Sequence, residues 1–283
     1  VAGASKGEGL GNKFLSYIRE VAVIVHVLRV FSDENIIRVG ATDLLSDFRV
    51  VETELQLADY ATIEKQKEPK GMTDASAKLR WEVIEKLKYG LNSGISAREI
   101  LSSDEEREVG KELGLLTAKK ALFLCNVDEG DAPRALELQK TFGEKLGVDP
   151  ELCVVISAKL ESEVAAFSEE EQRVYLKELG VTESGLERLI RSAYHTLGLQ
   201  AFLTAGKKEV RAWTVRVGAT AVEAAGEIHT DFMKKFIKAN IASLDDFIAC
   251  GGWKGVREQG KLKQEGKEYI MQDGDVVEFL IGT

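Results

Sequence analysis

Cysteine, proline and histidine are scarce in this sequence, with three of each among 283 residues. The cysteines are Cys125, Cys153 and Cys250; their number is odd and they form no C-x-x-C pair. This argues against a disulfide framework and a structural zinc site. Cys125 and Cys153 each lie within an apolar run, so we interpret them as reduced core residues. A reducing compartment, the cytosol, is therefore expected.

The sequence also lacks any apolar run of about 18 residues, the length that a membrane-spanning helix needs. The longest apolar stretch, Val21 to Phe31, is interrupted by His26 and Arg29. The first residues lack the apolar segment that a signal peptide requires. We therefore expect no membrane partner and a cytoplasmic location.

An excess of positive charge is missing as well, since the formal net charge is -9. A protein that coats nucleic acid non-specifically relies on lysine and arginine to neutralise phosphates, so DNA is not an expected partner. The charge is uneven: residues 200–283 hold 12 basic and 12 acidic residues and are neutral in sum. A local basic patch in that neutral segment remains compatible with binding to RNA.

Three runs rich in β-branched and apolar residues predict buried strands of a mostly parallel sheet. They are Val21–Phe31, Ala121–Cys125 and Leu152–Ile156. Between the last two, residues 132–146 carry Leu136, Phe142 and Leu146 at roughly helical spacing. A strand, a helix and a strand in succession form a βαβ unit, so the first part of the chain is predicted to be α/β.

The stretch from about residue 44 to 113 has almost no strand pattern and predicts two long helices, at about 47–67 and 74–91. The intervening Glu-Pro-Lys-Gly sequence at 68–71 is typical of a turn between helices. This is more helix than a crossover needs, so we interpret it as a helical hairpin inserted into the sheet domain. Its mixed charge fits either a solvated arm or a docking surface.

The last 84 residues, 200–283, predict a small α+β domain. Strands are expected at 202–204, 210–217 and 276–281, the last after an Asp-Gly-Asp turn at 273–275, and short helices at 219–225 and 232–238.

Polar residues follow two of the predicted strands at the point where each strand ends. Asn126, Val127, Asp128 and Glu129 follow the second strand, and Ser157, Ala158 and Lys159 follow the third. Ligands of parallel α/β sheets bind at the carboxyl ends of strands, so both groups are expected to face one crevice. Amide, carboxylate, hydroxyl and backbone groups together suit a planar heterocycle. The alternative is a loop with a helix N-cap and no ligand.

These two groups resemble the base-recognition motifs of P-loop GTPases, N-K-x-D and S-A-K, with two departures. Val127 stands where the lysine stem would cover the guanine ring, and Glu129 stands where an aspartate would accept two hydrogen bonds from guanine. One additional methylene displaces the carboxylate by about 1.5 Å, which is too far for bonds with a narrow distance window. We therefore expect guanine specificity to be lost.

The glycine-rich segment at residues 3–13 is not a Walker A loop, because no Gly-Lys-Ser/Thr follows four spacer residues. Its glycines are Gly3, Gly7, Gly9 and Gly11. Glycine gives the backbone conformational freedom, so a mobile switch segment is the better interpretation.

Several segments resemble the Obg-like ATPase (YchF) family. The N-terminal VAGASKGEGLGNKFLSYIREV resembles its switch II region, and LRVFSDENI, LSSDEEREVGKELGLLTAKKALFLCNVDE and ISAKLESEVA resemble later parts of its nucleotide domain. The segments AGKKEVRAWTVRVGATAVEAAGEIHTDFMKKFIKA, CGGWKG and QDGDVVEF resemble its C-terminal TGS domain, a β-grasp module. The resemblance covers nearly the whole chain.

The resemblance implies a P-loop NTPase-like nucleotide domain at 1–45 and 113–199, a coiled-coil insertion at 46–112 and a TGS domain at 200–283. It implies ATP as the preferred nucleotide, Mg²⁺ as cofactor, a switch function near the ribosome and binding to RNA; we expect a monomer. Asn126, Val127 and Glu129 would shape the base pocket, and Ser157, Ala158 and Lys159 would close it. The expected RNA or ribosome contacts are Lys207, Lys208, Arg211, Lys234, Lys235 and Lys238.

The family's Walker A loop and its Asp-x-x-Gly do not occur in the 283 residues, so catalytic residues are expected upstream of residue 1 and no metal ligand is assigned. By itself the chain is expected to be inactive. A non-catalytic RNA- or protein-binding scaffold is the rival hypothesis. Among the histidines, His26 is expected in the core and His195 at the surface, whereas His229 fits either an RNA contact or a structural turn.

Overall fold

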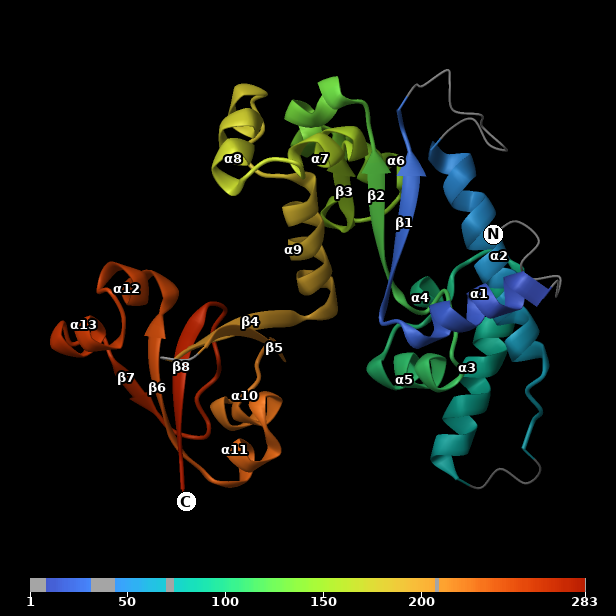
Figure 1. Cartoon of the computed structure of the whole chain (residues 1–283). Coiled ribbons are helices and arrows are strands. Elements are labelled where there is room, and N and C mark those ends of the chain that lie inside the picture. The colour runs from blue at the N-terminus through green and yellow to red at the C-terminus, as the bar shows by residue number, and fades with distance from the viewer. Residues whose placement is uncertain (1–8, 32–43, 70–73, 207–208, 283) are drawn as a thin grey trace. The chain divides into compact units, whose positions relative to one another are not determined.

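The computed structural model describes residues 9–31, 44–69, 74–206 and 209–282. The chain forms two compact units, residues 1–196 and residues 197–283, and Figure 1 shows the elements of each. The first unit contains a parallel sheet with helices, and the second contains a mixed sheet with shorter helices. This confirms the predicted α/β class with a second α+β part.

The sheet of the first unit contains β1 (Val23–Arg29), β2 (Lys120–Asn126) and β3 (Cys153–Ile156), all parallel, in that order. The three predicted β-branched runs therefore form its strands. The expectation that both faces of β1 are buried is wrong, because Val25 and Val27 are 37% and 64% exposed. Among the described residues β1 pairs only with β2, so it is an edge strand, and its side chains alternate between core and solvent.

Helices follow each of the last two strands. The predicted helix at 132–146 begins with a 3₁₀ turn, η2 (Glu129–Arg134), and continues as α6 (Ala135–Leu146); a second 3₁₀ turn, η3 (Pro150–Leu152), leads into β3. Phe142 and Leu146 pack against β2, but Leu136 is 72% exposed, because it lies on the other face of α6. The remaining helices here are α7 (Ala158–Val164), α8 (Glu169–Glu178) and α9 (Gly185–Leu197).

Between β1 and β2, the described part of the chain forms helices joined by turns and short loops. We call α2 (Leu44–Glu64) and α3 (Ala75–Asn92) the helical arm, and two short helices, α4 (Ala97–Ile100) and α5 (Asp104–Glu112), lead from the arm back to β2. Asp74 caps α3 by accepting a hydrogen bond from the Ala77 amide, as a residue at that position should. Another helix, α1 (Gly9–Glu20), precedes β1.

The second unit is built around a five-stranded sheet of order β5-β4-β8-β6-β7. Its strands are β4 (Leu199–Ala205), β5 (Val210–Arg216), β6 (Phe236–Ser243), β7 (Lys263–Glu265) and β8 (Asp275–Ile281). Only the β4–β8 pairing is parallel. Its helices are α10 (Ala221–Ile228), α11 (Thr230–Lys234), α12 (Leu244–Ala249) and α13 (Trp253–Glu258).

The predicted helix at 232–238 is partly wrong, because α11 ends at Lys234 and β6 begins at Phe236. Phe236, Ala239 and Ile241 pack in the core with Phe202 of β4 and Ala221 of α10. Burial of these β6 side chains in the core of the second unit therefore outweighs the helical spacing of the local sequence.

Two other expectations concern the core and the membrane. Cys125 and Cys153 are buried and free, as predicted, and Cys250 is a free, partly buried cysteine. Burial raises the pKa of the Cys125 thiol to about 12, which keeps it protonated and unreactive. In the described ranges there is no helix long and apolar enough to cross a membrane.

Candidate functional site

The loops after β2 and β3 lie side by side at the carboxyl edge of the parallel sheet. The Val127 amide donates a hydrogen bond of 2.8 Å to the Ile156 carbonyl, which joins the two strand ends. The Asn126 Oδ1 accepts a bond of 2.9 Å from the Ala158 amide. The residues after β2 and those after β3, which were expected to face one crevice, are thus joined directly by two hydrogen bonds.

A charged pair connects the same two loops. Lys159 Nζ lies 2.9 Å from Glu129 Oε2, and the two side chains are 71% and 32% exposed. The bond to Glu129 raises the pKa of Lys159, so the lysine stays charged at neutral pH. The Glu129 carboxylate, which corresponds to the base-reading aspartate of the GTPase motif, is therefore already engaged by a cation.

Ser157 and Val127 support the loops from within. Ser157 is 2% exposed and caps α7 by accepting a bond of 3.4 Å from the Leu160 amide. Val127 is 4% exposed and packs in the core beside Cys125. Of the six predicted base-site residues, Ala158 and Lys159 are thus exposed and Asn126 and Glu129 are half-buried, whereas Val127 and Ser157 are buried and support the loops.

One residue that sequence reasoning missed is Glu161, on α7. Its carboxylate accepts bonds of 2.6 Å and 3.3 Å from the amides of Gly185 and Leu186, at the first turn of α9. A Cβ at Gly185 would lie 2.5 Å from a methyl group of Ile156, so only glycine allows α9 to approach β3 this closely. Glu161 lies two residues after Ser-Ala-Lys, but nothing in the sequence identifies its partner 24 residues later.

The predicted switch glycines and the predicted RNA-contacting basic residues do not form one site in the described structure. Gly3, Gly7, Lys207 and Lys208 lie outside the described residues, and Gly9 and Gly11 belong to the first turns of α1. Arg211, on β5, stacks its guanidinium 4.1 Å from the ring centre of Trp213. Lys234 ends α11, Lys235 follows it, and Lys238 on β6 donates to Gln264. Arg211 and Lys238 lie on strands separated by β4 and β8, so they form separate patches.

His229 has a structural role at a turn, which was one of the two roles expected for it. Its Nδ1 accepts a bond of 3.1 Å from the Asp231 amide, so the ring caps the N-terminus of α11. Within the described ranges no group of three or more His, Cys, Asp or Glu residues is arranged to hold a metal ion.

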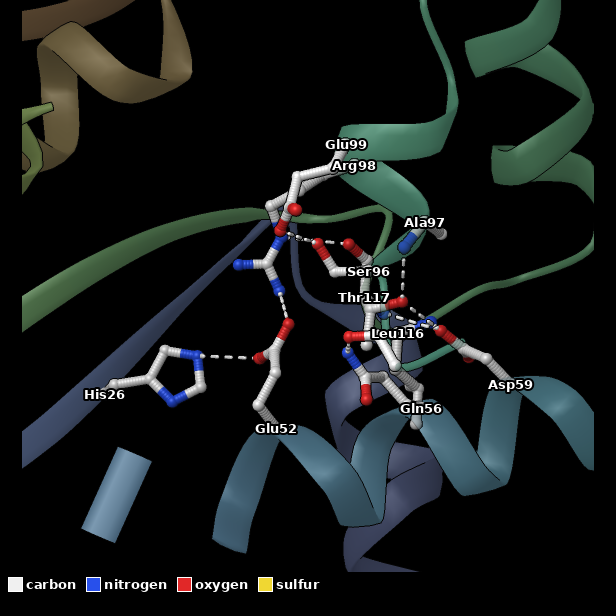
Figure 2. Close-up of polar contacts among 11 residues, drawn as sticks. His26, Glu52, Gln56, Asp59, Ser96, Ala97, Arg98, Glu99, Leu116 and Thr117 are labelled. Carbon is white, nitrogen blue, oxygen red and sulfur yellow. Dashed lines mark hydrogen bonds and ion pairs between the residues drawn. The ribbon is translucent and has the colours of Figure 1, made fainter. Parts of the chain in front are cut away.

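A buried polar cluster, which the sequence did not predict, joins β1, the arm and the segment before β2 (Figure 2). We call it the polar node and define it by His26, Glu52, Asp59, Arg98 and Thr117. Asp59 and Thr117 are 0% exposed. Burial lowers the pKa of His26 to about 4 and raises the pKa of Asp59. His26 Nε2 and Glu52 Oε2 are 3.9 Å apart, and neither atom has a hydrogen-bond partner within the described structure.

A parallel sheet with two hydrogen-bonded loops at its carboxyl edge makes the first unit an α/β domain of the class that binds ligands at that edge. The relatives identify its family. The chain is 44% identical to the ribosome-binding ATPase YchF of Bacillus subtilis over 286 residues, covering 99% of this chain and 78% of that protein. It is also 44% identical to the protein of that name from Escherichia coli O157:H7 over 289 residues, covering 100% and 79%.

The structure is similar to that of the Schizosaccharomyces pombe YchF GTPase, with a TM-score of 0.77 and 33% identity over 99% of this chain and 78% of that one. Residues 199–282 match the YchF-GTPase_C family, which is described as a protein of unknown function. The chain belongs to the YchF family, which confirms the resemblance found in its sequence.

Proposed function

We propose that this protein is an ATP-hydrolysing switch that associates with the ribosome and prefers ATP to GTP. The single observation that supports the nucleotide assignment is the junction of the two loops, in which Asn126 binds Ala158 and Glu129 binds Lys159. The Bacillus subtilis and Escherichia coli relatives named ribosome-binding ATPases support the activity and the partner.

The preference for ATP follows from the charges at the Glu129–Lys159 pair. Guanine would need a free carboxylate to accept bonds from its N1–H and 2-amino groups, and Glu129 must release Lys159 to provide one. Adenine has neither donor and imposes no such exchange. Because an exposed ion pair is worth at most about 1 kcal/mol, this effect accounts for a preference of up to about fivefold. The displaced carboxylate of the longer side chain adds to it.

The same proposal assigns a role to each part of the chain. Residues 1–45 and 113–199 belong to the nucleotide domain, 46–112 form the coiled-coil insertion, and 200–283 form a TGS domain that contacts RNA. The reaction uses Mg²⁺, for which we assign no ligand in the described residues. The protein acts in the cytoplasm as a monomer.

The nucleotide assignment is tested by competition of ATP and GTP against a fluorescent ATP analogue, using the product of the complete reading frame. We expect ATP to compete at lower concentration, and Glu129→Asp to shift the ratio towards GTP. Glu137→Asp is a matched control, because Glu137 forms a similar exposed ion pair with Arg134 at 2.8 Å. GTP competing tenfold better than ATP would overturn the proposal.

The ribosome assignment is tested by cosedimentation of three proteins with ribosomes. These are the parent, a version without residues 200–283, and one with glutamine at Lys207, Lys208, Arg211, Lys234, Lys235 and Lys238. We expect weaker binding with a shallower salt dependence in the substituted protein, because each phosphate contact that is lost removes part of the salt dependence. If both altered proteins pellet as the parent does, the second unit is not the anchor and the helical arm becomes the candidate.

The rival proposal is a scaffold without catalysis. It is favoured by one observation, that the 283 residues contain no Walker A motif to hold the β- and γ-phosphates. Phosphate release from the 283-residue chain and from the complete product separates the two. Magnesium-dependent release by the complete product supports the switch, and its absence with intact ribosome binding supports the scaffold.

A further inference from the structure

Helix α1 is packed directly on the helical arm. Leu15 of α1 is 4% exposed and lies in one apolar cluster with Leu55 and Ala58 of α2 and with Leu116, which precedes β2. Arg19, at the end of α1, donates a bond of 3.3 Å to the Thr62 hydroxyl of α2. The apolar cluster thus joins three separate segments of the chain.

The end of α1 is fixed by a lysine from the segment before β2. Lys119 Nζ donates bonds of 2.9 Å and 2.7 Å to the carbonyls of Arg19 and Val21. The last four carbonyls of a helix have no partner within the helix, and a cation there also interacts favourably with the helix dipole. Lys119 is therefore a C-terminal cap for α1 that comes from 98 to 100 residues further along the chain.

The same segment is anchored to the arm by a buried carboxylate. Asp59 of α2 accepts bonds of 2.7 Å from the amides of Leu116 and Thr117 and from the Thr117 hydroxyl, as Figure 2 shows. A buried carboxylate without partners would be strongly destabilising, so these three bonds fix the position of the segment relative to α2. Residues 116–119 are thus bound by Asp59 at one end, and at the other end Lys119 caps α1.

The remaining bonds of the polar node attach α4 to this segment and to α2. Thr117 accepts bonds from the Ala97 amide, at 3.0 Å, and from Arg98 Nε, at 2.9 Å. Arg98 also donates a bond of 2.7 Å to Glu52, on α2. The segment at 116–119 is therefore bonded to α1, α2 and α4 without an intervening flexible connection.

We infer that Asp59 and Lys119 are positioning residues that make residues 116–119 a coupling element, so that a displacement of α1 moves the helical arm. That α1 moves with the bound nucleotide rests on the proposed function; the mechanical coupling does not. Helix α3 has 18 residues and is about 27 Å long. A rotation of about 5° at its base therefore moves its far end by about 2 Å.

The coupling is tested without nucleotide by distances between spin labels on α1 and on the arm. Labels are attached at Tyr17→Cys and Lys78→Cys, both exposed, in a Cys250→Ser background, because Cys125 and Cys153 are buried. The test variants are Asp59→Asn and Lys119→Met. The controls are Asp74→Asn, an exposed cap on α3, and Lys111→Met, an exposed ion pair with Glu108.

We expect each test variant to shift or broaden the distance distribution by about 2 Å or more, whereas both controls keep the distribution of the parent. Lys119→Met keeps most of the side-chain volume, so it provides a folded protein even if Asp59→Asn reduces stability. Unchanged distributions in the Lys119 variant, or equal broadening in the controls, would overturn the inference.

A second measurement in the complete product follows the distance between Lys78→Cys and Glu144→Cys on α6, with and without a non-hydrolysable ATP analogue. We expect the distance to change in the parent and the controls and to stay constant in the test variants, with analogue binding retained in all. Loss of analogue binding in the parent contradicts the proposed function alone. Movement of the arm in both test variants contradicts the coupling.

Discussion

Replacement of His26 with phenylalanine should flatten the pH dependence of the stability of the first unit. His26 is 4% exposed, stacks on Phe123 with ring centres 5.4 Å apart, and meets Phe48 edge-on at 5.4 Å. Phenylalanine preserves both ring contacts and removes the titrating group. Since neither His26 Nε2 nor Glu52 Oε2 has a hydrogen-bond partner among the residues that the structure describes, the substitution breaks no described bond at that nitrogen.

The magnitude follows from the pKa of His26, which burial and then the charge of Arg98 lower from 6.5 to about 4. As the pH falls below 6.5, the unfolded chain binds a proton at this histidine and the folded chain does not. The neutral histidine therefore contributes its full stabilisation above pH 6.5 and loses it progressively down to about pH 4. At about 1.4 kcal/mol per unit, the loss amounts to about 3 kcal/mol.

Two carboxyl groups of the node titrate in the opposite sense. Burial raises the pKa of Glu52 and of Asp59, so their contribution is present at low pH and is lost as the pH rises through the folded-state pKa. Both groups are present in the parent and in the variant. The difference in the pH dependence of stability between the parent and His26→Phe therefore reports on His26.

The assay is urea unfolding at about pH 7, 5.5 and 4, followed by the fluorescence of Trp81 on α3. Trp213 and Trp253 lie in the second unit and are replaced with phenylalanine in every protein compared, so that only the first unit is observed. The stability advantage of the parent should shrink by about 3 kcal/mol between about pH 7 and about pH 4. His195→Phe, at an exposed site on α9, is the control, and parallel curves for parent and His26→Phe would refute the reasoning.

Three further predictions concern other parts of the chain. Gly255→Ala should destabilise the second unit by about 3 kcal/mol or more, because a Cβ at residue 255 would lie 1.9 Å from the Cys250 carbonyl oxygen. Gly266→Ala should leave the stability unchanged, because a Cβ there meets nothing within 4 Å, and thermal unfolding followed by Trp253 fluorescence measures both variants. Glu129→Asp should move the ATP-to-GTP affinity ratio towards GTP by up to about fivefold, and an unchanged ratio in the competition assay would contradict the role of Glu129. The 283-residue chain alone should release no phosphate from ATP above background, because phosphoryl transfer depends on the phosphate loop and metal, and sustained magnesium-dependent release would refute this.

The sequence predicted those parts of the fold whose signal is local. The β-branched runs gave the three strands of the parallel sheet, and the polar residues after two of them indicated where its loops meet. The second sheet was harder to predict. Phe232, Phe236 and neighbouring lysines suggest a helix, and it is the pairing with β8 and β7 that makes Phe236–Ser243 a strand. Strand β7 has three polar residues, so it carries no pattern at all.

The polar node was missed for a different reason. Asp59 lies in an ordinary amphipathic helix, where an acidic residue predicts a solvated face. Its partners, Leu116 and Thr117, come 57 and 58 residues later. No periodicity within α2 distinguishes a buried carboxylate from an exposed one, so this part of the site depends on tertiary structure. His26 was expected to be a satisfied core residue; it is buried, but its Nε2 has no hydrogen-bond partner in the described structure.

The open side of β1 has a practical consequence for handling the 283-residue chain. Val25 and Val27 are exposed beside backbone groups that no described strand pairs with. An apolar strand edge of this kind is a template for another chain, and the net charge of -9 opposes such self-association only by long-range repulsion. Salt screens that repulsion. At one protein concentration, stocks in high-salt buffer should therefore scatter more light than stocks at low salt, and Val27→Lys should reduce that scattering.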